Sequence, residues 1–236
     1  INRPDVIINC AGITDMDLCE KEPELAYRVN ALGARNLSIV ARKIGAKIVQ
    51  ISTDDVFDGN KNTPYSEFDD TNPKTVYGRS KRAGENYVRE FTHKHFVIRS
   101  SWIFGHGDNF VTRVLRKAGN GELIEAAIDE TGCPTSAKDL ARIILYLITT
   151  NEYGTYHATC KGLCSRYDFA REILSLAGLH AEVKEISIAD SKEHLVRPAY
   201  VVLDNFILRI IDVYEMPKWK QSLEEYIAEW KEETHE

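Results

Sequence analysis

Apolar residues follow two alternating patterns in the N-terminal half of the chain. Three short runs, 6–10, 47–52 and 95–101, are rich in Val and Ile and are bounded by polar or turn-forming residues. Runs of this kind are typical of parallel strands that are buried on both faces. Between them, residues 22–44 carry apolar side chains at helical spacing, and residues 75–92 are compatible with a second helix. This order predicts a doubly wound parallel sheet, in which ligands bind outside the carboxyl ends of the strands.

Three further helices and one strand are predicted in the second half. Segments 136–148 and 165–178 each begin with Ser followed three residues later by Asp, which is a capping pattern for a helix start. Residues 154–159 have the composition of a strand. Residues 222–233 place Leu, Tyr, Ile and Trp on one face of a last helix.

The two patterns divide the chain near residue 128. Residues 1–128 are predicted to form a partial, Rossmann-like dinucleotide-binding domain, because they hold the strand–helix–strand units. Residues 129–236 are expected to form mainly a smaller α/β substrate-binding lobe, with some segments returning to the core, so that the boundary is interleaved. The predicted fold class is therefore α/β.

The start of the sequence lacks the first unit that such a sheet needs. The chain opens INRPDVIINCAG, without Met, and its first predicted strand begins within these residues. Pyrophosphate-binding sheets carry a glycine-rich turn between a strand and a helix, and no GxxGxxG pattern occurs in the 236 residues. We therefore expect a strand–turn–helix unit upstream of Ile1, in a longer protein.

Charge and composition restrict the partners. The formal net charge of −6 argues against nucleic acid as the main partner. The longest strongly apolar run, 143–148, is too short to cross a bilayer, and no signal-peptide pattern opens the chain. The five cysteines are odd in number and form no CxxC pair, as expected of reduced thiols. We expect a cytoplasmic protein without a membrane partner.

Two tyrosine–lysine pairs with the same spacing are candidates for chemistry. Positions i and i+4 share a face of a helix, so Tyr77 and Lys81 can point into one site. In the second pair, Tyr214 and Lys218, Pro217 excludes helical continuity. The second pair is therefore predicted to belong to a linker.

The surroundings of Tyr77 suggest proton transfer. A free tyrosine with a pKa near 10 exchanges protons poorly at neutral pH, and the Lys81 ammonium is expected to lower that pKa. Thr53, or as second choice Ser52, lies at the end of the preceding strand and can hydrogen-bond the same substrate oxygen. Gly78 costs about 1 kcal/mol in a helix relative to Ala, which the close approach of a ligand or a strand would explain.

A hydroxyl at a strand end followed by Tyr-x-x-x-Lys on the next helix resembles the extended short-chain dehydrogenase/reductase superfamily. Further motifs, spread in order over nearly the whole chain, are similar to those of the dTDP-4-dehydrorhamnose reductase family. These motifs are PDVIINCAGIT, CEKEPELAYRVNALGARNL, ISTDDVFDG, PKTVYGRSKRAGE, RSSWIFG, NFV, DETGCPT and RPAYVVLDN.

The resemblance implies an oxidoreductase of dTDP-rhamnose biosynthesis. The reaction would be the reduction of the C4 ketone of dTDP-4-dehydrorhamnose to dTDP-L-rhamnose, with NADPH or NADH as cofactor. The implied catalytic residues are Thr53 and Tyr77, which would bind the ketone oxygen, and Lys81, which would lower the tyrosine's pKa and hold the nicotinamide ribose. Tyr77 would donate the proton.

The resemblance also implies two binding sets. Asn30 matches an asparagine with a structural or proton-relay role, Trp102 matches a residue that packs against the sugar, and a core position is the alternative for Trp102. Arg197 could reach a diphosphate, with an ordinary surface position as the alternative. The implied cofactor-binding residues are Asn9, Cys10, Ala11, Asn30, Ser52, Tyr77 and Lys81. The implied substrate-binding residues are Thr53, Asp55, Trp102, Thr131, Gly132 and Arg197.

One departure from the family pattern leaves alternatives open. The family usually has an aromatic residue that contacts the sugar at the position of Asp55. A carboxylate in its place leaves open a reductase or epimerase of another nucleotide sugar, or a non-catalytic regulatory or binding protein on the same scaffold. Some relatives bind a divalent ion at a subunit contact, so Mg2+ and a homodimer are weaker expectations. The sequence contains no acidic cluster that demands a metal.

Overall fold

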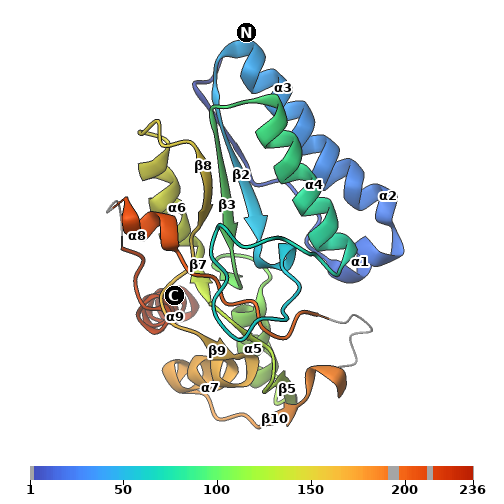
Figure 1. Cartoon of the computed structure of the whole chain (residues 1–236). Helices are drawn as coiled ribbons and strands as arrows, with labels where there is room; N and C mark the ends of the chain where they lie inside the picture. Colours follow the sequence, from blue (N-terminus) through green and yellow to red (C-terminus); the bar gives the residue numbers. More distant parts are fainter. Residues whose placement is uncertain (1–2, 191–196, 212–214, 236) are drawn as a thin grey trace.

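A four-stranded parallel sheet lies at the centre of the N-terminal half (Figure 1). The computed structural model describes residues 3–190, 197–211 and 215–235. Every neighbouring pair of strands is parallel, which confirms the predicted sheet. The strands, in spatial order, are β1 (Val6–Asn9), β2 (Lys47–Thr53), β3 (His95–Ser100) and β8 (Gly154–His157).

Helices cover both faces of the sheet (Figure 1). On one face, α3 (Gly33–Ile44) and α4 (Val76–Phe91) pack over Ile48 and Val97. On the other face, α6 (Ala137–Leu147) belongs to a larger cluster that includes Val49, Phe96 and Ile98 from the neighbouring positions of the same strands. The alternation follows from the two-residue period of a strand and explains why these strands are apolar on both faces.

The segment before α3 differs from the single helix predicted over 22–44. A short helix α1 (Met16–Lys21) precedes α2 (Pro23–Ala26), and a π-helix over Tyr27–Leu32 then leads into α3. π-Helical turns are rare and occur frequently at functional sites. Here the turn places Asn30 in a buried position against Ser80 of α4. The helical content of the prediction is correct, and its hydrogen-bond pattern is wrong in this turn.

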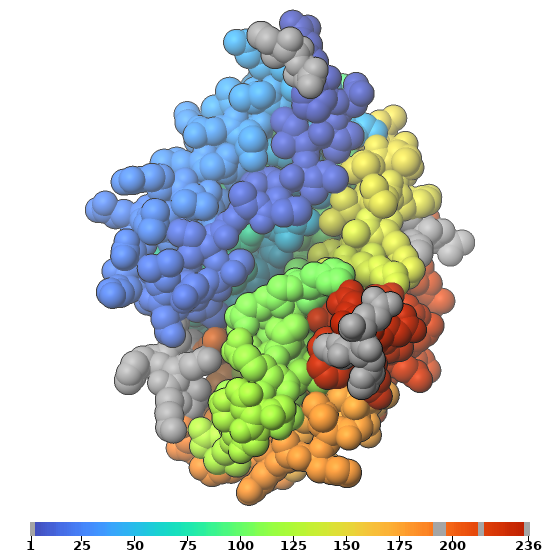
Figure 2. Space-filling view, turned by 180° about the vertical axis from the view of Figure 1, so that it is seen from behind, coloured from blue at the N-terminus to red at the C-terminus, as the bar shows by residue number. Residues whose placement is uncertain are grey.

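A second lobe forms around a pair of parallel strands, β5 (Ile124–Ala127) and β10 (Val183–Ile186). Figure 2 shows from behind that the blue N-terminal part and the green-to-orange lobe lie at opposite ends of the molecule. The helices of this region are α5 (Phe110–Gly119), α7 (Arg166–Ala177) and α9 (Trp219–His235), whereas α8 (Phe206–Ile210) packs against β8 of the central sheet. The short strands are β4 (Ile103–Phe104), β6 (Thr131–Gly132), β7 (Thr135–Ser136) and β9 (Cys164–Ser165), and short 3₁₀ turns span Asp54–Val56 and Ile188–Asp190.

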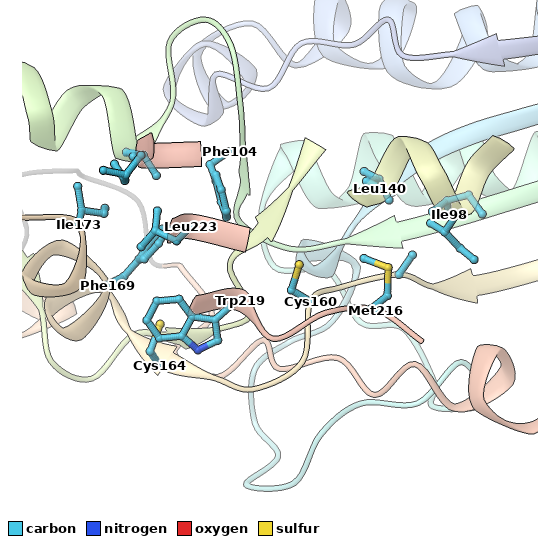
Figure 3. Packing of buried hydrophobic residues seen from close by; sticks show 14 of the residues in the cluster. Ile98, Phe104, Leu140, Cys160, Cys164, Phe169, Ile173, Met216, Trp219 and Leu223 are labelled. Atoms are coloured by element: carbon cyan, nitrogen blue, oxygen red, sulfur yellow. The ribbon is translucent and has the colours of Figure 1, made fainter. Parts of the chain in front are cut away.

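The lobe and the sheet share one apolar core. Figure 3 shows its side chains extending from Ile98 and Leu140 beside the sheet to Phe169 and Ile173 in the lobe. The Phe169 ring lies within 6.3 Å of four other aromatic rings, measured between ring centroids. These rings belong to Trp102, Phe104, Phe110 and Trp219.

The predicted helix starts are present with one change. Ser136 caps α6 by accepting a hydrogen bond from Lys138 N, and Ser165 caps α7 by accepting one from Asp168 N. Asp139 does not complete a capping box, because its carboxylate accepts hydrogen bonds from Ser222 and Arg142 instead. The cap was predictable from the local sequence, whereas the contact of Asp139 with Ser222 depends on the tertiary structure.

The predicted division at residue 128 stays a prediction, although its interleaving is visible. Helix α5 and strand β5, from the first part, pack with α7 and β10 of the second. In exchange, β8 from the second part joins the central sheet. No helix among the residues that the structure describes has the length and apolar character needed to cross a membrane.

Candidate active site

The carboxyl ends of β1, β2 and β3 meet the first turns of α4. Thr53 is the last residue of β2, and its hydroxyl accepts a hydrogen bond from Asp55 N at 3.1 Å, which caps the 3₁₀ turn. Thr75 caps α4 in the same way by accepting from Gly78 N at 3.0 Å. These two caps fix where β2 stops and where α4 starts. The predicted helix therefore presents Tyr77 in its first turn beside Thr53.

Glycine at two positions of α4 permits this close packing. A Cβ at Gly78 would collide with the carbonyl oxygen of Asp55, and a Cβ at Gly84 would collide with that of Asn30. The helix therefore lies directly against the turn after β2 and against the π-helix. A close approach at Gly78 is present, and the approaching group is the backbone of the 3₁₀ turn after β2, not the ligand or strand that was predicted.

The pKa of Tyr77 is raised above its ordinary value, not lowered. Burial is the largest cause and the nearby Asp55 carboxyl the next, whereas the Thr53 hydroxyl, within hydrogen-bonding reach of the phenol, acts in the opposite direction. The Lys81 ammonium donates to Ile51 O at 2.6 Å, and its predicted effect of lowering the pKa of Tyr77 stays a prediction. At neutral pH the phenol is protonated, which is the state that a proton donor requires.

Lys81 lies beneath the loop that follows β1. Its Nζ is 3.7 Å from where a Cβ on Gly12 would be. Burial lowers the pKa of Lys81 to about 8, and the charges of Glu85 and Cys10 act against that decrease. Cys10 and Ala11 are exposed in this loop, at the sheet edge where cofactor-binding residues were predicted.

Asn30 and Asn9 hold this loop in place. The Asn30 amide donates to Ile13 O at 3.0 Å and to Ser80 Oγ at 2.9 Å, and its oxygen accepts from Ile13 N at 2.8 Å. The Asn9 amide donates to Gln50 Oε1 at 2.7 Å. Both side chains are buried and hydrogen-bonded within the fold. These bonds agree with a structural role for Asn30, and its proton-relay and cofactor-binding roles stay predictions.

Two neighbouring carboxyl groups follow Thr53. Asp54 is buried and accepts hydrogen bonds from Ser101 Oγ at 2.6 Å and Thr53 Oγ1 at 2.9 Å. Asp55 is only partly buried, and its pKa is raised to about 8, first by desolvation and then by the charge of Asp54, while Arg197 opposes the increase. A carboxyl group with a raised pKa therefore lies close to Tyr77.

Trp102 is packed by side chains of the lobe. Its backbone φ of 44° is the only positive value at a non-glycine position in the described part of the chain. The indole lies against Gly132, where a Cβ would collide with the ring, and the Arg166 guanidinium lies 3.6 Å from the ring centroid. Glu130 accepts a hydrogen bond from Arg166 Nε at 3.0 Å. The indole remains partly exposed, so contact with a sugar stays a prediction.

Arg197 and Thr131 lie in the lobe near this site. Arg197 lines a cavity of about 1040 Å³ beside the start of α4, together with Lys21 and Lys74. Its charge also acts on Asp55, which shows that the two side chains are close. Thr131 is partly exposed, and its backbone pairs with Ala199 and Val201 in the segment that follows Arg197. A diphosphate-binding role for Arg197 stays a prediction.

The structure also brings together residues that the sequence reasoning missed. Glu85 follows Lys81 by four positions on α4, and this spacing was a usable signal. Arg99 interrupts an apolar strand, which is a second signal. Asp54 follows Thr53 directly in the sequence and acts on Tyr77. Glu130 and Arg166 carried no sequence signal, because only the fold brings them near Asp55.

Two further predictions concern the second tyrosine–lysine pair and metals. Tyr214 lies outside the described residues, and Lys218 lies in a non-helical segment that bridges to Lys161, as the linker prediction requires for Lys218. Within the described ranges, no group of three or more His, Cys, Asp or Glu side chains could hold a metal ion. The weak expectation of Mg2+ therefore has no support here.

Comparison with known proteins agrees with this arrangement. Residues 1–232 match the family model described as the RmlD substrate binding domain. The spore coat polysaccharide biosynthesis protein SpsK of Bacillus subtilis is 38% identical over 229 residues, which cover 96% of this chain and 80% of that protein.

Two crystal structures of dTDP-4-dehydrorhamnose reductases are close to this one. The structure from Clostridium acetobutylicum has a TM-score of 0.94 and 42% identity, and the match covers 97% of this chain and 81% of that one. The structure from Bacillus anthracis, in complex with NADP, has a TM-score of 0.94 and 40% identity, covering 96% and 81%. The resemblance seen in the motifs is confirmed. The chain belongs to the RmlD substrate-binding-domain family and has its Rossmann-like α/β fold.

Proposed function

We propose that this protein is an NAD(P)H-dependent reductase of a nucleotide-linked sugar, with the C4 ketone of dTDP-4-dehydrorhamnose as its substrate and dTDP-L-rhamnose as its product. One observation carries the proposal: Thr53, Tyr77 and Lys81 lie together at the carboxyl edge of a parallel sheet. This edge is where open α/β sheets bind their ligands. The relatives named dTDP-4-dehydrorhamnose reductase support the choice of sugar.

The residues present fit a nicotinamide ribose beside Lys81. The loop at Cys10 and Ala11 is exposed and passes beside the ammonium. Lys81 donates one of its three N–H groups to Ile51 O, which leaves two for ribose hydroxyls. When bound, the reduced cofactor would supply the hydride. The exposed loop and the ammonium together would orient it.

The chain's own residues would handle the proton. Tyr77 holds the phenolic proton that the ketone oxygen must receive, because burial keeps its pKa above the ordinary value. On substrate binding, the Thr53 hydroxyl would turn its one proton from Asp54 to the same oxygen and so stabilise negative charge that develops on it. The composition fits an enzyme of the cytoplasm, and a homodimer stays a prediction.

The decisive experiment is turnover by the Tyr77→Phe variant of the full-length protein. We expect kcat to fall at least about 100-fold, because general acid catalysis typically contributes 100- to 10,000-fold. NADPH consumption and NMR of the sugar product measure this. The control is Tyr87→Phe, which removes a hydroxyl from the same helix α4 outside the site. Equal rates in the wild type and Tyr77→Phe would refute the assigned role.

Asp55 supports a second candidate, a reductase or epimerase of a different nucleotide sugar. Its carboxyl group is partly exposed close to Tyr77, so it would contact the sugar there. A carboxyl group favours a sugar that presents a hydroxyl or amino group at this position. Product analysis by NMR with several dTDP- and UDP-linked sugars would separate the candidates. Absence of both NADPH and dTDP binding by calorimetry would instead favour the non-catalytic alternative.

A further inference from the structure

Glu85 is a charged side chain buried directly behind the candidate active site. Its exposed fraction is 0%, and it follows Tyr77 by eight positions and Lys81 by four on α4. Residues at this spacing share one face of a helix. A buried carboxylate needs charged or hydrogen-bonding partners, so its partners show what it holds in place.

The Glu85 carboxylate has partners on both of its oxygens. Arg99 binds it at two points, with Nε 2.9 Å from Oε1 and Nη2 2.8 Å from Oε2. Arg89 Nη2 adds a contact of 2.8 Å to Oε2, and Ser52 Oγ donates to Oε1 at 2.6 Å. Burial alone would raise the pKa of Glu85, but the hydrogen bond and charge of Arg99 lower it to about 2. The group is therefore ionised whenever the protein is folded near neutral pH.

Two of these partners, Ser52 and Arg99, are each the residue before the last in strands β2 and β3. Ser52 directly precedes Thr53 on β2, and in the parallel register Ser52 is opposite Arg99. Lys81 is attached to the residue before, through its bond to Ile51 O. Helix α4 is thus joined to two consecutive residues of β2, immediately before the hydroxyl that meets Tyr77.

Arg99 also connects Glu85 to β8, the strand next to β3 in the sheet. Its Nη1 lies 3.4 Å from His157 Nε2, and burial lowers the pKa of His157 to about 3, so the neutral ring can accept a hydrogen bond. The guanidinium also lies 5.2 Å from the centroid of the Phe57 ring. Phe57 follows the 3₁₀ turn that contains Asp55. Arg99 of β3 therefore contacts β8 and the residue after this turn, and Glu85 connects it to Ser52 of β2.

We propose that Glu85 is a positioning residue: through Ser52 and Arg99 it fixes the Thr53 hydroxyl relative to Tyr77 and Lys81. This inference rests on the proposed reductase function. A buried ion pair is weak support for stability in itself, since apolar replacements are often as stable. The location of Glu85 explains the carboxylate better than stability does, because its Oε1 accepts a hydrogen bond from Ser52, the residue next to Thr53.

The test is Ser52→Ala, which removes the hydrogen bond between Glu85 and β2 while the Arg99 and Arg89 contacts remain. We expect kcat to fall about 10- to 100-fold with both KM values changed less than about twofold, since small misplacements of reacting groups have effects of this size. Ser52→Thr, which keeps a hydroxyl, should restore most of the rate. A raised KM for NADPH would instead show that Ser52 binds the cofactor, and would overturn the proposal.

The matched control is Ser38→Ala, which removes an equally buried hydroxyl on α3, where Ser38 Oγ donates to Ala34 O at 2.7 Å. We expect it to leave kcat unchanged, and equal kcat in the two variants would contradict the positioning role. Crystal structures of both variants give a readout that does not need turnover. A longer Thr53–Tyr77 hydroxyl separation in Ser52→Ala alone supports the proposal, and an unchanged separation overturns it. A wild type without reductase activity would refute the proposed function instead.

Discussion

Single residues of α4 show how closely this site depends on backbone contact. Gly78 follows the proposed proton donor directly, and there the helix lies against the carbonyl oxygen of Asp55. The absence of a side chain at Gly78 therefore sets the distance between α4 and the turn that contains Asp55. The helix propensity lost at this position is offset by a contact that no other residue permits.

Replacing Gly78 by Ala should damage both stability and turnover. The added methyl group must push α4 away from the turn, and forced overpacking typically costs about 1–3 kcal/mol. Thermal or urea unfolding measures the stability, and kcat reports the displaced Tyr77. Gly119→Ala is the matched control, because that glycine also lies in a helix and no atom is within 4 Å of its added Cβ. The control should be neutral or stabilising by up to about 1 kcal/mol, and equal losses in both variants would contradict the argument.

At the scale of elements, α4 is attached to β2 by charged side chains as well as by apolar packing. The hydrogen bonds and positive charges around Glu85 outweigh the effect of burial and make its protonation costly in the folded state. Folding therefore depends on pH through this group. The ordinary pKa of 4.5 applies to the unfolded chain, and the folded value is about 2.

The free energy of unfolding should fall as the pH decreases from about 4.5 to about 2. The folded pKa is lower than the unfolded one, so the stabilisation is complete above the unfolded pKa and is lost as protons bind at low pH. A difference of this size corresponds to roughly 3 kcal/mol for Glu85. Urea unfolding at several pH values measures how steeply the free energy of unfolding changes with pH. In Glu85→Gln this slope should correspond to about one fewer proton taken up on unfolding. An identical slope in the wild type and Glu85→Gln would show that other carboxylates dominate.

The same elements show what sequence reasoning could and could not supply. The buried strands and the Ser136 and Ser165 caps follow from local patterns, and the structure has them. Strand β10 was missed because its central residues, Lys184 and Glu185, are polar and exposed. The π-helix was missed because helical periodicity does not distinguish an i+4 from an i+5 hydrogen bond over one turn.

The residues of the candidate site were predictable from local sequence, but their electrostatic environment was not. The spacing of Tyr77 and Lys81 and the strand end at Thr53 identify three groups that the fold then brings together. The raised pKa of Tyr77 could not be foreseen, because it comes from burial and from Asp55, and both depend on the tertiary structure. The pairing of Glu85 with Arg99 likewise needs the register of β2 and β3.

At the scale of the whole molecule, the apolar core is continuous from the sheet to the lobe (Figure 3). Phe169 lies on α7 in the lobe and is fully buried. Its ring contacts Trp102, which leads out of β3 towards the site, and Trp219 at the start of α9. Because this apolar core is not interrupted between the sheet and the lobe, we expect the two parts to unfold together.

Phe169→Ala should therefore destabilise the whole protein and not the lobe alone. Removing a buried phenylalanine typically costs about 3–5 kcal/mol through lost transfer energy and the cavity left behind. Urea unfolding followed by far-UV circular dichroism reports the sheet and helices, and tryptophan fluorescence reports the lobe. Both signals should shift to lower urea together. Phe68→Ala is the control, because that ring is 72% exposed and pairs in a T-shaped arrangement with Phe206, so its loss should cost no more than about 1 kcal/mol. Separate transitions, with only the fluorescence signal shifted, would show that the lobe unfolds independently of the sheet.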